Sequence, residues 1–136
     1  MEEAVLTLHA QYNKRNMSEC RVYSDRVEME TKCTGGLLPV YKNATRVIYF
    51  SEIVRVVISS STTGFFAHHP NAIHFITGEG QRTLDTLFRD PKFLSRDYID
   101  EGVQQFCAAN AQDLTEKIAL ASRIKAYIEE KTGRKL

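Results

Sequence analysis

The chain of 136 residues has no tryptophan, three prolines and three cysteines. Cys20, Cys33 and Cys107 are far apart and form no CxxC pair, so a disulfide framework is excluded and free thiols in a reducing compartment are expected. Long apolar runs are also missing, whereas a membrane-spanning helix needs roughly 20 such residues. The N-terminus begins with acidic residues and has no signal-peptide core. These absences predict a cytoplasmic protein without a transmembrane segment.

An excess of either charge is missing as well. The chain carries 18 Lys and Arg residues against 17 Asp and Glu residues, for a formal net charge of +1. Proteins that bind nucleic acid or anionic membranes through their overall charge have a large positive excess. The composition therefore argues against nucleic acid as a partner and leaves open only a local basic patch.

No catalytic motif is present. The strongest chemical signal is FFAHHPNAIHF at 65–75, which contains three of the four histidines. His68, His69 and His74 are the only candidates for a metal site, but they lack the HExxH spacing and have no cysteine nearby in sequence. The glycines of TGEGQR at 77–82 do not form a P-loop pattern. The sequence therefore predicts a protein that is not an enzyme and has no cofactor.

Short β-branched and aromatic runs separated by turn signals fill the first 80 residues, as in all-β proteins. The segment 19–32 predicts a hairpin with a turn at Ser24-Asp25-Arg26, because apolar and charged residues alternate after the turn. Four further runs predict strands: 4–10, the segment 45–61 as two strands meeting near Ser51-Glu52, 71–78 and 103–109.

The C-terminal segment predicts an amphipathic helix over about 110–132. Its apolar residues recur at three- and four-residue steps, which places them on one face. Asn110 with Asp113, or Asp113 with Glu116, suits the N-terminal cap, and Gly133 is placed to end the helix. The apolar residues of the stripe are Leu114, Ile118, Ala121, Ile124 and Ile128. We therefore expect one domain over 1–136, with short helical turns inside an insertion at about 81–102.

The order of these segments resembles that of the bacterial pleckstrin-homology-like (PH-like) domains. In CRVYSDRVEMETK the residues of the family's x-V-Y-D-D-R-V-x-I hairpin are matched at Val22, Tyr23, Asp25, Arg26 and Val27. The segment 47–53 matches the family's I-P-Y-x-x-I strand, with Ile48 where a proline is common, and NAIHF and IKAYIEE follow. The resemblance covers roughly residues 18–132. It implies a partly open barrel, or two packed antiparallel sheets, capped by one amphipathic helix.

The resemblance also implies a scaffold for binding. We expect a binding module that interacts with a protein partner or with itself as a homo-oligomer. The alternative is binding of an anionic lipid or small ligand at a basic rim of the barrel, which leaves a peripheral membrane contact open. Glu19 stands where phosphoinositide-binding PH domains place a central cation. The candidate rim residues are Lys14, Arg15, Arg21, Lys42 and Arg46.

Overall fold

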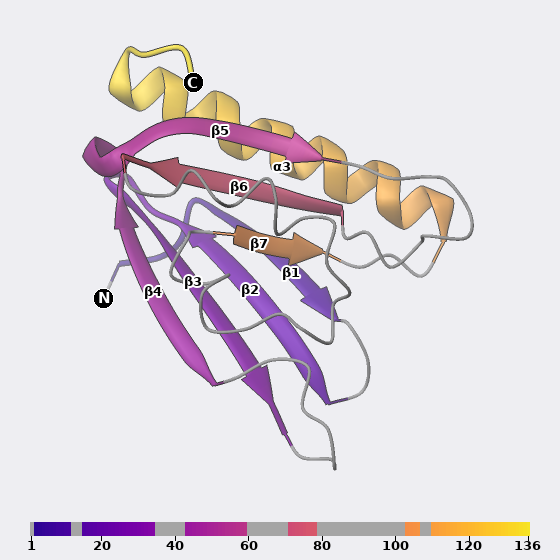
Figure 1. Cartoon of the computed structure of the whole chain (residues 1–136). Helices are drawn as coiled ribbons and strands as arrows, with labels where there is room; N and C mark the ends of the chain where they lie inside the picture. The colour runs from indigo at the N-terminus through magenta and orange to yellow at the C-terminus, as the bar shows by residue number, and fades with distance from the viewer. Residues whose placement is uncertain (1, 12–14, 35–42, 60–70, 79–102, 107–109) are drawn as a thin grey trace.

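The computed structural model describes residues 2–11, 15–34, 43–59, 71–78, 103–106 and 110–136. The elements are β1 (Leu6–Gln11), β2 (Asn16–Val22), β3 (Arg26–Cys33), β4 (Ala44–Tyr49), the 3-10 turn η1 (Phe50–Glu52), β5 (Ile53–Ser59), β6 (Asn71–Thr77), β7 (Val103–Phe106) and the helix α3 (Ala111–Thr132). The strands form two antiparallel sheets, sheet A in the order β1-β2-β3-β4 and sheet B in the order β5-β6-β7 (Figure 1). The expectation of a mainly β chain with a C-terminal helix is confirmed, and the expected insertion at 81–102 lies outside the described residues.

Sheet A has one core-facing side and one solvent-facing side, because its strands alternate apolar and polar residues. Met29 is buried on β3, while its neighbours Glu28 and Glu30 are partly exposed. The predicted hairpin is confirmed, since β2 pairs with β3 from Val22 opposite Val27 onward. On β1 the alternate residues Leu8 and Ala10 are buried in the same way.

The two sheets are joined by η1, at the place where the sequence predicts that two strands meet. The backbone N–H of Tyr49 donates to the Glu52 carboxylate at 2.9 Å, and the N–H of Phe50 donates to the carbonyl of Asp25 at 2.9 Å. The first bond holds η1 to the end of β4, and the second attaches η1 to the β2–β3 turn. The chain therefore leaves sheet A at a fixed point before it enters β5.

The helix α3 begins and ends at the residues that the sequence indicates. The Asn110 side chain accepts the N–H of Asp113 at 2.8 Å, which confirms the first of the two proposed caps. At the other end Gly133 has a φ of 65°, a left-handed conformation that favours glycine. Ala121, Ile124 and Ile128 are buried, and the remaining stripe residues are partly buried against the core.

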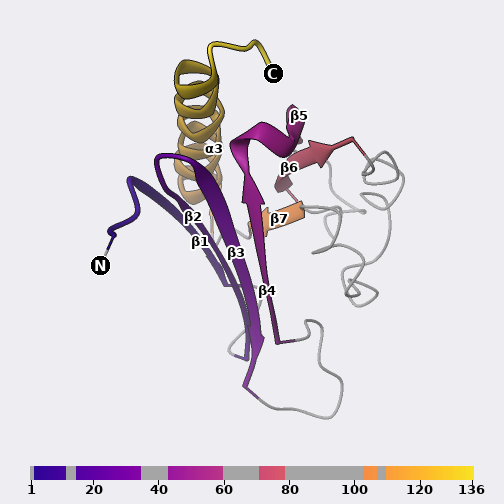
Figure 2. The ribbon, with the colours of Figure 1, turned by 90° about the vertical axis from the view of Figure 1, so that its left-hand side faces the viewer.

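The core lies between the two sheets and α3. Buried residues of both sheets and of the helix form one cluster, and β7 contacts β1 and β2 across it. Figure 2 shows sheet A seen along its edge, with α3 near one end of the strands and sheet B to one side. In both views the β3–β4 end of sheet A points away from α3. Within the described residues, no helix is long and apolar enough to cross a membrane.

Candidate functional site

The strand β4 forms one edge of sheet A. It pairs with β3 on one side, and no strand of the described residues pairs with its other side. The edge strands β1 and β5 differ from it, because both contact α3. The edge of β5 is also met by the C-terminal residue, since the Leu136 carbonyl accepts the N–H of Val56 at 3.3 Å. We call the free side of β4 the β4 edge.

The backbone of the β4 edge offers hydrogen-bonding groups to the outside. In an antiparallel pair, alternate residues turn their N–H and C=O groups toward the partner strand and away from it. The Tyr49 N–H is held by Glu52 rather than by β3, and the Phe50 N–H bonds to Asp25. Since the backbone groups of Tyr49 point away from β3, those of Val47 and Thr45, two and four residues earlier, also point away from β3. The β4 edge therefore presents these groups to any strand that lies beside it.

The solvent-side residues of β4 are neutral. Val47 is 42% exposed and Tyr49 is 49% exposed, and Thr45 is exposed on the same side of the strand. Natural edge strands are commonly protected from pairing by charged residues or proline. The one charged residue of β4 is Arg46, which lies opposite the buried Met29 and so on the core side. The solvent side of β4 therefore carries none of these protecting residues.

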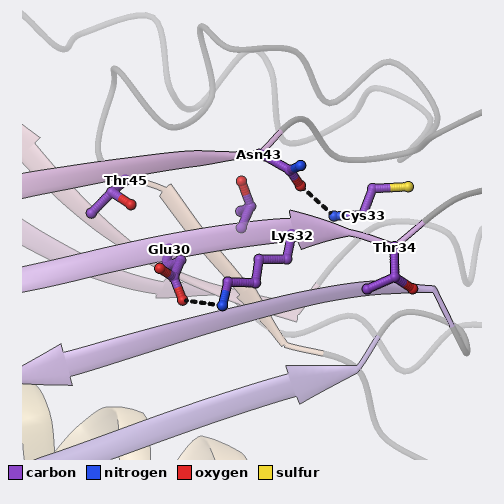
Figure 3. Close-up of a pocket in the computed structure, with 7 residues that line it drawn as sticks. Glu30, Lys32, Cys33, Thr34, Asn43 and Thr45 are labelled. Atoms are coloured by element: carbon purple, nitrogen blue, oxygen red, sulfur yellow. Dashed lines mark hydrogen bonds and ion pairs between the residues drawn. The ribbon is translucent and has the colours of Figure 1, made fainter.

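A polar pocket of about 380 Å³ lies at the end of the β4 edge, where β3 ends and β4 begins (Figure 3). Two interactions shape it. The Lys32 ammonium lies 3.4 Å from the Glu30 carboxylate, and the Asn43 side chain accepts the N–H of Cys33 at 2.7 Å. The lining residues are Glu30, Thr31, Lys32, Cys33, Thr34, Asn43 and Thr45. Thr45 thus belongs to both the pocket and the β4 edge.

An ion-pair cluster covers the centre of the solvent side of sheet A. Arg21 donates to Glu19 at 2.6 Å, and its guanidinium lies 3.8 Å from Glu28 and 3.9 Å from Glu30. The hydrogen bond with Glu19 raises the pKa of Arg21 above its usual value. Arg26 extends the cluster by bonding to Glu28 at 2.9 Å. The residues of β3 that lie opposite the solvent-side residues of β4 are therefore charged, whereas the solvent-side residues of β4 are neutral.

The structure does not bring the described basic candidates together at one rim. Arg15 is exposed at the start of β2 and lies about 20 Å along the strand from Arg21. Arg21 is engaged by three carboxylates, and Arg46 is on the opposite side of sheet A. The Nε of Arg46 is buried and has no hydrogen-bond partner among the described residues. Lys14 and Lys42 lie outside the described residues.

Of the three histidine candidates the structure describes His74. His74 is in the middle of β6, at 0% exposure, and burial lowers its pKa to about 4. It is therefore neutral at physiological pH. His68 and His69 lie outside the described residues. Within the described part of the chain, no three His, Cys, Asp or Glu residues are grouped in a way that could hold a metal ion.

The cysteines within the described residues occupy different environments. Cys20 is fully buried in the core, and burial raises the pKa of its thiol well above the usual range. Cys33 is partly exposed and lines the pocket at the end of the β4 edge. Both are free thiols, in agreement with the sequence-based expectation for these two residues. The buried Cys20 acts as a small apolar core residue.

Sequence reasoning did not identify Val47 and Tyr49 as surface residues of interest. The signal was present, because β4 is apolar or neutral at Val47 and Tyr49 as well as at the buried Ile48. A strand that is apolar on both faces needs a second covering surface or remains partly exposed. The pattern alone did not show that β4 is an edge strand.

Comparisons with known proteins give no relative from which a function could be taken. No protein-family model matches the chain, and no curated protein and no solved structure matches it significantly. The functional argument therefore depends on the geometry of the site.

Proposed function

We propose that the protein is a non-catalytic binding module that recognises a protein partner by pairing an extended strand with the β4 edge. The observation that carries this proposal is the open, neutral edge with Val47 and Tyr49 exposed beside it. Pairing of this kind draws its affinity from backbone hydrogen bonds and its specificity from side chains at alternate positions. It requires no catalytic motif and no cofactor.

The proposal includes a PH-like architecture for the chain. A four-stranded meander, a three-stranded meander and a C-terminal helix follow one another in the order that the resemblance implies. The contacts of α3 with β1 and β5 support a helix that covers one opening between the sheets. Fold analogy does not assign a function, so the binding role depends on the β4 edge.

The alternative function, binding of an anionic lipid or small ligand at a basic rim, has less support. Its described candidates lie apart: Arg15 is exposed at the start of β2, Arg21 is engaged by three carboxylates, and Arg46 is on the core side of sheet A. Sedimentation with anionic and with neutral vesicles tests this alternative. Salt-sensitive binding to anionic vesicles alone would favour it over the protein partner.

Photo-crosslinking in cells tests the proposed function directly. A photoreactive phenylalanine analogue replaces Tyr49, which is 49% exposed beside the β4 edge, or Val54, which is 54% exposed on β5. We expect a protein adduct from position 49 and none from position 54, because Tyr49 lies beside the β4 edge, whereas β5 is contacted by α3 and by the C-terminal residue. Equal adducts from both positions, or none from position 49, would contradict the proposal.

A further inference from the structure

We infer that the strand received by the β4 edge is β4 of a second copy of this chain, paired antiparallel about a two-fold axis at Val47. This inference rests on the proposed function and names the partner for the same edge. Three properties of β4 support it: the register that its free backbone groups allow, the neutrality of its solvent side, and the pocket at Thr45.

The backbone groups select the register. Two strands that continue the sheet must keep their core-facing residues on the same side, so the two-fold axis passes through a residue. With the axis at Val47, the N–H groups of Val47 and Thr45 in both copies, which no described strand engages, can donate across the interface. In either register the Tyr49 N–H stays bonded to Glu52. With the axis at Ile48, Thr45 would lie opposite Ser51, which belongs to η1 and not to a strand, so only the Val47 N–H of each copy would donate to the other strand. The axis at Val47 therefore satisfies more of the exposed backbone.

The charges of the β4 residues also favour a two-fold axis at Val47. An axis at Arg46 would place two guanidinium groups directly opposite each other, which is destabilising. With the axis at Val47, Val47 lies opposite its own copy, and Thr45 lies opposite Tyr49 of the second copy. These cross-strand pairs are neutral, and pairs of β-branched and aromatic residues of this kind stabilise sheets. The β4 edge is thus complementary to itself.

The pocket supplies a place for the aromatic ring. Tyr49 of the second copy would stand opposite Thr45, on the solvent side, where the pocket of about 380 Å³ opens. Thr45 is small, so a tyrosine ring can lie over it and reach toward Glu30 on the next strand. The Glu30 carboxylate and the Asn43 side chain are polar partners within the same pocket for the tyrosine hydroxyl. Each chain would fill the pocket of the other.

The assembly closes at two chains. Both copies use the same edge in a two-fold interface, so no further β4 edge remains to continue a filament. A single pair of short strands buries little surface, which places this interface among the small, transient ones. We expect dissociation constants in the micromolar range.

The solution mass of wild type and four variants tests the inference, and thermal unfolding checks that each variant is folded. We expect a two-chain mass for the wild type at high micromolar concentration. Val47→Lys should give a one-chain mass, because it places two ammonium groups opposite each other at the axis. Val54→Lys, a substitution at a similarly exposed valine on β5, should leave the two-chain mass unchanged.

A charge swap tests the register. Thr45→Lys with Tyr49→Lys should give a one-chain mass, because the two positions face each other across the interface. Thr45→Lys with Tyr49→Glu should restore two chains through opposite charges. The second pair suits the fold as well, since Thr45 lies opposite Glu30 and Tyr49 lies opposite Arg26 on β3. Equal masses for the two double variants would overturn this register.

Hydrogen exchange gives a readout that needs no variant. The Thr45 and Val47 amides should exchange more slowly as the wild-type concentration rises, whereas unchanged exchange would overturn the inference. A one-chain wild-type mass combined with an adduct between position 49 and another protein would overturn self-pairing and leave the proposed function standing. A one-chain wild-type mass with no adduct at position 49 would contradict both self-pairing and the proposed function.

Discussion

His74 shows how a single residue couples stability to pH. The imidazole is at 0% exposure, between Val57 on β5 and Val103 on β7 in the strand register, and burial lowers its pKa to about 4. An unfolded histidine titrates near 6.5. Above that pH both states are neutral, so His74 adds no pH dependence. As the pH falls from about 6.5 toward 4, the unfolded state binds a proton that the folded state does not, and stability is lost.

We therefore predict that His74→Gln removes part of the acid sensitivity of the domain. Between pH 7 and pH 4, wild type should lose about 3 kcal/mol of unfolding free energy more than the variant, since each pKa unit corresponds to about 1.4 kcal/mol. Urea unfolding at several pH values measures this difference. Parallel stability curves for wild type and variant would show that His74 is not the group responsible.

Arg46 shows at the same scale why the candidate rim could be predicted only in part. Its positive charge suggests a surface cation, and the sequence does not state which side of a strand it occupies. The alternation Thr45, Val47, Tyr49 against Arg46 and Ile48 becomes decisive only once Ile48 is known to be buried. The surroundings of Arg21 also depend on strand pairing, because its carboxylate partners come from a neighbouring strand as well as from its own.

At the scale of elements, α3 was the easiest to predict. Its helical period, its cap at Asn110 and its end at Gly133 are local signals, and each is confirmed. The strands were also visible from their alternation. The open side of β4 was not, because the position of a strand within a sheet depends on pairings between residues far apart in sequence. The β4 edge is therefore the feature that required the structure.

The two faces of α3 predict different effects of an added charge on the stability of the domain. Ile124 is at 0% exposure, so Ile124→Asp should unfold the domain, because an unpaired carboxylate in the core costs several kcal/mol. Ala119→Asp on the exposed face of the same helix should leave the fold intact. Circular dichroism and thermal unfolding of the two variants distinguish these outcomes. Equal stability of the two would show that the helix does not bury the expected face.

The end of α3 provides a second element-scale prediction with a matched glycine. Gly133 has a φ of 65°, where an alanine side chain is strained, and Gly78 has no such conformation and no atom within 4 Å of an added Cβ. Gly133→Ala should lower the unfolding free energy by about 1 kcal/mol, and Gly78→Ala should not lower it measurably. Chemical unfolding of both variants measures the difference. A loss at Gly78 that equals the loss at Gly133 would refute the role of the left-handed cap.

At the scale of the whole molecule, η1 connects the two sheets and the helix. Phe50 is 5% exposed, and its ring meets the Tyr127 ring of α3 edge to face, with centroids 6.3 Å apart and an interplanar angle of 79°. Beyond the helix, Arg134 donates to the Phe50 carbonyl at 2.7 Å. Because η1 passes directly from β4 to β5, these contacts tie the end of the β4 edge to α3.

A double-mutant cycle measures how strongly Phe50 and Tyr127 are coupled. We predict that Phe50→Leu and Tyr127→Leu each destabilise the domain, and that the double variant loses about 1 kcal/mol less than the sum of the single losses, because an edge-to-face pair adds about that much beyond its burial. Unfolding free energies of the four proteins give the coupling. Losses that add to within about 0.3 kcal/mol would mean that the two rings act independently. If the two rings are coupled and the variants have the same solution mass as wild type, the coupling acts within one folded chain. The β4 edge is then not involved.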